Sequence, residues 1–149
     1  MSLYLNKLAR KHDIDQAIRQ TEDLVVVLRF GKESESITMQ LDEILCKTSA
    51  LLANMAKIYT IDMNAIPVYR DYFDISISPS TVFFFNAQHM KVDYNTPDHT
   101  KFIGTFKNKQ DFIDLIETIY RGAMRGKVMV KSPIAFTDVS QYELLYKDF

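Results

Sequence analysis

The sequence predicts a three-layer α/β/α domain on a central mixed β-sheet. Runs of apolar and β-branched residues at 24–30, 56–63 and 81–85 are typical of strands buried on both faces. Helical patterns separate these runs, and this strand–helix–strand order indicates a parallel central portion with right-handed crossovers. An alternating segment at 89–94 follows the third run after a short polar turn, which predicts an antiparallel edge.

In the N-terminal half, apolar residues at helical spacing separate the strands. Ile14, Ala17 and Ile18 share one face of the first helix, and Gly31 ends the strand before the second helix. The expected elements, in chain order, are a strand at 3–5, a helix at 13–20, a strand at 24–30, a helix at 38–55 and a strand at 56–63.

In the C-terminal half, Asn108 predicts the start of a helix. Its side chain can cap the free backbone N–H groups of the first turn, and Asp111 follows three residues later. Gly122 or Gly126 is expected to end that helix. The other expected elements are a short helix at 65–73, a loop at 75–80, strands at 81–85 and 89–94, and a loop at 95–100.

Length and composition indicate one soluble domain. The 149 residues are enough for one core, and 47% of them are apolar and 25% charged, as in ordinary globular proteins. Glycine and proline, four of each, are too scarce for a disordered chain. We expect a folded domain at 1–126 and an extension at 127–149 that packs on the domain or on a partner.

Charge and residue content exclude several classes of function. The net charge of −1 argues against bulk attraction to nucleic acid, and no segment has the roughly 18 apolar residues of a membrane span. The one cysteine, Cys46, cannot form an internal disulfide, which favours the cytosol or nucleus. His12, His89 and His99 lie in separate elements and no Gly-rich phosphate loop occurs, so neither a metal nor a cofactor is expected.

The segment from Arg29 to 45, together with the element order, resembles the thioredoxin fold. Thioredoxins place Cys-x-x-Cys at the start of the helix after this strand, where the helix dipole lowers the pKa of a thiol. Here those four positions are Glu35-Ser36-Ile37-Thr38, so Glu35 and Thr38 are degenerate redox positions. Arg29 stands at the position of the buried acid that assists thiol chemistry in thioredoxins.

The loop Ser78-Pro79-Ser80-Thr81 is similar to the thioredoxin loop that contains a cis-proline. The resemblance implies a cis peptide bond before Pro79. In thioredoxins this loop lies beside the active site, and peptides dock there by edge pairing. We therefore expect the backbone of 78–81 to serve as a binding surface even though the thiols are absent.

Longer strings of sequence resemble the spliceosomal Dim family of thioredoxin-like proteins. These strings lie at 25–31, 39–45, 80–85 and 116–123. Further segments resemble the 4B (Dim2-like) branch of the family, namely 73–75, 88–94, 97–102 and the tail from 132. This resemblance implies a non-catalytic nuclear protein of pre-mRNA splicing. It also implies association with the tri-snRNP and pre-mRNA processing factor 6, and a role in cell-cycle progression.

Two alternatives to an interaction protein come from the residues themselves. One is a monothiol redox protein that uses Cys46, although a thiolate is normally activated at a helix start and Cys46 is expected inside one. The other is RNA binding through 101–131, which holds seven basic residues and three acidic ones. The candidate contacts with RNA phosphate or an acidic partner are Arg121, Arg125, Lys127 and Lys131. Their position also has a structural explanation, because cations are favourable near the C-terminal end of a helix dipole.

The C-terminal tail contains candidate residues for self-association. Its apolar side chains need to be covered, either by the domain or by a neighbouring copy. The first arrangement would leave a monomer, and the second would make a homodimer; the sequence leaves both open. The residues concerned are Tyr142, Leu145, Tyr146 and Phe149.

Overall fold

Strand β2 (Val25–Gly31) lies in the middle of a seven-stranded sheet, and all seven of its residues are buried. The structure is a computed structural model that describes residues 5–135, and the seven strands are those of this range. β2 pairs in parallel with β3 (Ala56–Asp62) and antiparallel with β4 (Ser80–Phe85). The sheet is therefore mixed, as the sequence predicts.

The direction of β4 differs from the parallel arrangement expected after a helical crossover. Helix α3 (Pro67–Tyr72) has six residues and so rises only about 9 Å. The seven residues of β3 span roughly 23 Å. α3 is thus too short to carry the chain back along β3, and β4 starts at the end of the sheet where β3 finishes.

The outer strands are short. The strand order is β1-β3-β2-β4-β5-β7, and β6 pairs with the start of β4. Sequence reasoning did not identify β6 and β7, which have two and three residues. The bounds are Asn6–Lys7 for β1, Gln88–Asp93 for β5, Phe102–Ile103 for β6 and Met129–Lys131 for β7.

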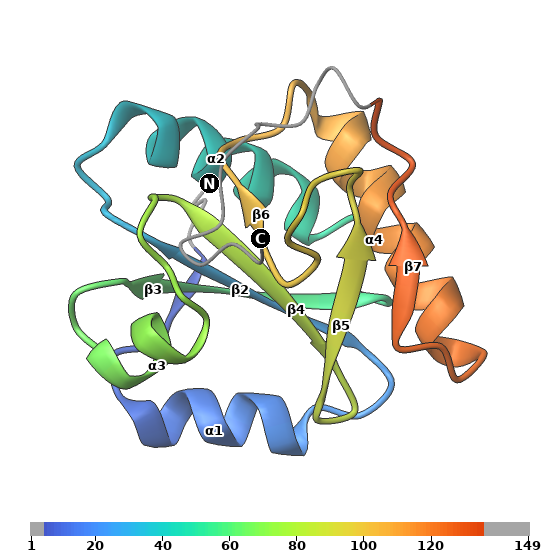
Figure 1. Ribbon diagram of the computed structural model, residues 1–149, viewed down its shortest axis with the longest axis horizontal. Helices are drawn as coiled ribbons and strands as arrows, with labels where there is room; N and C mark the ends of the chain where they lie inside the picture. The colour runs from blue at the N-terminus through green and yellow to red at the C-terminus, as the bar shows by residue number, and fades with distance from the viewer. Residues whose placement is uncertain (1–4, 136–149) are drawn as a thin grey trace, which may run out of the picture.

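The helices cover both faces of the sheet (Figure 1). Alternate residues of β2 point to opposite faces, so Val25 and Val27 belong to one core cluster and Val26 and Leu28 to the other. Helices α2 (Ser36–Ser49) and α4 (Lys109–Met124) pack on the first cluster, and α1 (Lys11–Gln20) packs on the second with the segment around α3. None of the described helices has both the length and the apolar character needed to cross a membrane.

Two element boundaries differ from expectation. Helix α2 ends at Ser49 and not at 55, because the chain tightens into turns with i→i−3 backbone hydrogen bonds, from Ala53 to Ala50 at 3.4 Å and from Met55 to Leu52 at 2.8 Å. Strand β1 is Asn6–Lys7, paired with β3; of the strand expected at 3–5, only residue 5 is described, and it is not part of β1.

The boundaries of α4 follow from its caps. The side chain of Asn108 accepts a 2.9 Å hydrogen bond from the N–H of Asp111, as predicted. Gly126, at φ +84°, follows the end of the helix, whereas Gly122 lies inside it. Of the extension expected at 127–149, residues 129–131 form β7, and residues from 136 onward lie outside the described part.

Candidate binding site at the start of helix α2

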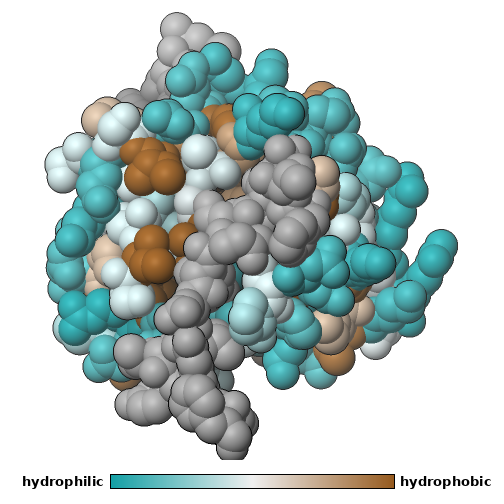
Figure 2. Space-filling view, turned by 45° about the horizontal axis from the view of Figure 1, so that its top comes forward, coloured by the Kyte–Doolittle hydropathy of each residue, from teal (hydrophilic) through white to brown (hydrophobic). Residues whose placement is uncertain are grey.

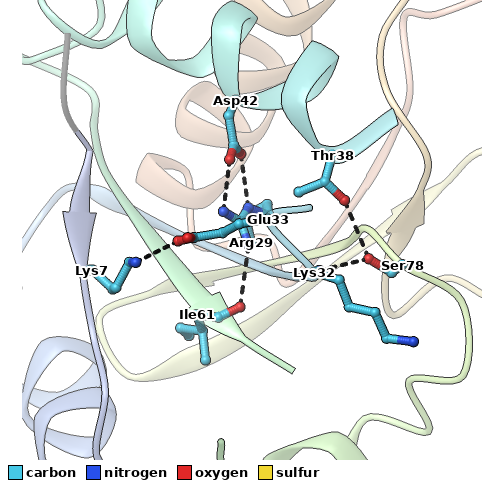
Figure 3. A network of polar contacts seen from close by, with 8 residues as sticks. All are labelled: Lys7, Arg29, Lys32, Glu33, Thr38, Asp42, Ile61 and Ser78. Carbon is cyan, nitrogen blue, oxygen red and sulfur yellow. Dashed lines mark hydrogen bonds and ion pairs between the residues drawn. The ribbon is translucent and has the colours of Figure 1, made fainter. Parts of the chain in front are cut away.

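The end of β2, the start of α2 and the loop before β4 meet where the central strands end (Figure 3). We call this region the α2 edge. The Ser78–Pro79 peptide bond is cis, the conformation expected for this loop. The hydroxyl of Ser78 accepts a 2.9 Å hydrogen bond from the N–H of Lys32 and lies 3.3 Å from the hydroxyl of Thr38. The loop is thus joined to the segment that follows β2, at Lys32, and to the first turns of α2, at Thr38.

The pair Arg29–Asp42 lies beneath this edge. The side chain of Arg29 is only 1% exposed, and its guanidinium donates two 2.8 Å hydrogen bonds to Asp42. A third hydrogen bond, of 3.3 Å, runs from Nη1 to the carbonyl of Ile61 on β3. Bidentate pairs of this kind are among the stronger polar contacts in proteins. The position that holds a buried acid in thioredoxins therefore holds a positively charged arginine, which is paired with Asp42 and cannot accept a proton.

The two degenerate redox positions differ in exposure. Thr38 is fully buried, while Glu35 is half-buried and immediately precedes α2. Glu35 does not cap the helix with its side chain, and its Oε1 atom is buried without a hydrogen-bond partner among residues 5–135. A carboxylate and a hydroxyl cannot form a disulfide with each other, so this pair has no thiol–disulfide chemistry.

Only part of the cis-proline loop is accessible. Ser80 and Thr81 are completely buried in β4, which pairs there with β2 on one side and β6 on the other. Their backbone is therefore not free to pair with a partner strand, contrary to the expectation for 78–81. Ile77, which is exposed, and Ser78, which is half-buried, form the accessible side of the loop.

Exposed apolar side chains surround this accessible part. Ile37 and Met39 on α2 and Ile77 on the loop are exposed. On the part of the surface visible in Figure 2, hydrophobic side chains form small separate patches between polar ones. Separate exposed apolar side chains are common on protein surfaces, so these three residues are candidate contact positions and do not by themselves define a site.

Cys46 does not belong to this site. It lies eight residues after Thr38 in α2, about 12 Å farther along the helix axis. Burial, with a smaller contribution from Asp42, raises the pKa of its thiol. Because the thiolate is the reactive form, this environment disfavours the monothiol alternative.

The basic segment expected at 101–131 is less continuous than its sequence indicates. Lys101 is buried and forms a 2.5 Å ion pair with Asp98, so it cannot reach a phosphate. Arg121 pairs with Glu117 at 2.8 Å. Arg125, Lys127 and Lys131 are exposed near the end of α4 and on β7. The tail candidates Tyr142, Leu145, Tyr146 and Phe149 lie outside the described residues.

Sequence reasoning missed a pocket between α1 and α3, on the face of the sheet opposite α2. It has a volume of about 350 Å³ and is lined by residues more than 50 positions apart, such as Lys11 and Val68. No local pattern in the sequence marks such a pocket, because it forms only when the two helices pack on the sheet. Among residues 5–135, no group of three histidine, cysteine or acidic side chains could hold a metal ion.

The chain is similar in sequence and fold to several known proteins. The family described as "Mitosis protein DIM1" matches residues 4–136. Mouse "Thioredoxin-like protein 4B" is 62% identical over 148 residues, which cover 99% of both chains. "Spliceosomal protein DIB1" from Eremothecium gossypii is 36% identical, with 89% of this chain and 92% of the relative covered. The crystal structure of chloroplastic thioredoxin z matches with a TM-score of 0.64 at 16% identity, covers 82% of this chain and 99% of its own, and shows the thioredoxin fold.

Proposed function

The chain belongs to the mitosis protein DIM1 family, and on that premise we propose that it is a non-catalytic interaction protein of pre-mRNA splicing in the nucleus. One observation carries the proposal. The cis-proline loop lies beside the start of α2, but a paired Arg29 lies where an acid would assist thiols, and Glu35 and Thr38 replace the cysteines. The family name and the spliceosomal relative support the splicing role and a link to cell-cycle progression.

Proteins of the tri-snRNP, and pre-mRNA processing factor 6 among them, are the proposed partners. The contact surface is the accessible part of the α2 edge, namely Ile37, Met39, Ile77 and Ser78. Contact with RNA is indirect or weak, since Lys101 and Arg121 are already paired. We further propose that the tail residues Tyr142, Leu145, Tyr146 and Phe149 support a homodimer, which analytical ultracentrifugation of a Tyr146→Ser variant would test.

Affinity purification from nuclear extract tests the proposal. The tagged full chain is expected to recover tri-snRNP proteins and pre-mRNA processing factor 6, identified by mass spectrometry. An Ile37→Glu/Ile77→Glu variant should lose them, because it places two charges on the proposed contact surface. Leu51→Glu is the matched control, since Leu51 is also exposed but lies after the end of α2. Absence of these proteins from the wild-type sample would contradict the splicing role.

The non-catalytic part of the proposal needs its own measurement. In an insulin-reduction assay, the wild-type chain should show no turnover above the uncatalysed rate. Turnover that disappears in Cys46→Ser would contradict the proposal and establish the monothiol alternative. The two assays are independent, so each part of the proposal can fail without the other.

A further inference from the structure

Helix α3 leaves apolar side chains in solvent. None of its six residues is buried, and Val68 and Tyr72 are 51% and 76% exposed. Both residues line the pocket between α3 and α1, together with the buried rings of Phe73 and Phe84. The volume of about 350 Å³ is at the lower end of the range of ligand sites, so it fits one or two side chains rather than a large cofactor.

Most polar groups around this pocket satisfy one another. Lys11 forms a 2.7 Å ion pair with Asp15, and the hydroxyl of Tyr69 donates to the same carboxylate. The ammonium of Lys11 also lies 5.8 Å from the centre of the Tyr69 ring. These groups therefore form a closed set whose formal charges cancel.

Arg19 is the exception. It is exposed, lines the same pocket, and makes no hydrogen bond or ion pair with any residue between 5 and 135. Arg19 acts electrostatically on Asp15 and Tyr69, but with Lys11 also present the pocket combines an apolar floor with a net positive charge. This charge is complementary to a carboxylate on the occupant.

The surroundings favour a peptide over a nucleic acid. Tyr72 and Phe73 also line a neighbouring pocket that contains the exposed residue Asp74. The other nearby carboxylates are paired, Asp98 with Lys101 and Asp71 with Arg70. A nucleic-acid strand that stacked a base on Tyr72 would bring its phosphates close to Asp74. A peptide can instead insert an apolar side chain and orient its one acidic group toward Arg19.

We propose that the pocket between α1 and α3 is a docking site for a peptide segment of a partner protein. The segment places a large apolar or aromatic side chain against Val68, Tyr72 and Phe73, and an aspartate or glutamate against Arg19. This site lies on the opposite face of the sheet from the α2 edge. The inference rests on the proposed function only in treating the chain as a binding protein.

Selection of short random peptides displayed on phage, with the immobilised full chain as target, tests the proposal. The enriched peptides are expected to share an aromatic or large aliphatic residue close to an acidic one. Their affinity, measured by fluorescence anisotropy with synthetic copies, should fall roughly tenfold or more in Tyr72→Ala and in Val68→Asp. Selection against Arg19→Glu should favour basic residues in place of acidic ones.

The controls keep the proposal falsifiable. All three substituted residues are exposed, so circular dichroism should show folded variants. Ile37→Glu changes the α2 edge and should leave peptide affinity unchanged. The proposal is overturned if no motif is enriched, if the peptides bind Tyr72→Ala and Arg19→Glu as well as wild type, or if Ile37→Glu abolishes binding. It is also overturned if a single-stranded RNA oligonucleotide binds and loses affinity in Tyr72→Ala.

The proposed function fails separately. If tri-snRNP proteins copurify with the wild-type chain but no peptide depends on Arg19 and Tyr72, only this docking site is wrong. If peptides bind as expected and no splicing protein copurifies, the docking site stands and the splicing role fails.

Discussion

Arg29 and Asp42 connect strand β2 to helix α2 through two parallel hydrogen bonds of 2.8 Å, from Nε to Oδ1 and from Nη2 to Oδ2. The two side chains are unequally buried, at 1% and 26% exposed. Asp42 can therefore be hydrated without its partner, but Arg29 cannot. In the folded protein, the charge of Arg29 therefore depends on Asp42 for its stabilisation more than the charge of Asp42 depends on Arg29.

Asp42→Ala should consequently destabilise the fold. It leaves a buried guanidinium without its counter-ion, and we expect the free energy of unfolding in urea to fall by about 3 kcal/mol, the lower end for a broken buried pair because water reaches Asp42. Glu43→Ala is the control, since Glu43 pairs with Lys47 in solvent, and should change that free energy by about 0.5 kcal/mol or less. Equal effects of the two substitutions would contradict this account of Arg29.

Cys46 should react slowly with alkylating reagents. Burial raises the pKa of its thiol, and Asp42 adds to that effect, so less thiolate is present at neutral pH than in an unfolded chain. Iodoacetamide at pH 7.5 is expected to modify the native protein several-fold more slowly than the protein in urea, as followed by intact-mass spectrometry. A faster reaction in the native state would show an activated thiol and reopen the monothiol reading.

His89 should make stability depend on pH. Burial against Phe73 and Phe84 lowers the pKa of the imidazole below its ordinary value of about 6.5, although the ring's Nε2 lies 2.9 Å from the carbonyl of Thr100. Below that value the unfolded chain takes up a proton that the folded chain resists. The contribution of His89 to the free energy of unfolding is therefore fully present above about pH 7. It decreases as the pH falls toward 5.

Urea unfolding between pH 5 and 8 measures this effect. Phenylalanine keeps the ring stacking without titrating, so His89→Phe should have a shallower pH dependence than wild type, by at most about 1.4 kcal/mol per pH unit. His12→Gln serves as the control for the loss of a histidine from an exposed position of α1. Identical slopes in wild type and His89→Phe would disprove the role of His89.

Gly122→Ala should destabilise the protein although it lies inside a helix. At an open helical site this change stabilises by about 0.4–1 kcal/mol. Here the new methyl group would lie 2.4 Å from Cγ1 of Val130 on β7, so we expect a loss of about 1–3 kcal/mol in the free energy of unfolding. Gly122→Ala/Val130→Ala should show non-additive recovery relative to the single variants. A stabilising Gly122→Ala would mean that β7 does not pack as described.

The fold was largely predictable because its main signals are local. Buried strands such as β2 show as uninterrupted apolar runs, and the start of α4 shows as the Asn108 cap. The missed features depend on distant contacts. The direction of β4 follows from the length of α3, and β7 has three residues whose strand character comes only from pairing with β5.

The candidate site was predictable in its residues but not in its accessibility. Arg29, Thr38 and Ser78 follow from aligning the segment with the thioredoxin pattern; in the structure the hydroxyls of Thr38 and Ser78 lie 3.3 Å apart, and Arg29 pairs with Asp42. That Ser80 and Thr81 are closed on both sides depends on β6, which no periodicity indicates. The pairing of Lys101 with Asp98 was likewise invisible, because a count of basic residues ignores burial.

Strand β7 also bears on aggregation. Its pairing with β5 is continued by hydrogen bonds from Lys91 to Val128 at 2.9 Å and from Ser132 to Asp93 at 2.8 Å. Unpaired edges of alternating strands are templates for intermolecular sheet growth, whereas short edges with lysine are poor ones. β7 covers Lys91–Asp93, half of the six-residue strand β5, and itself ends in Lys131. A chain that stopped at 126 would lose the core side chains of Val130 and Ile134 and expose β5, and we expect it to associate through that bare edge.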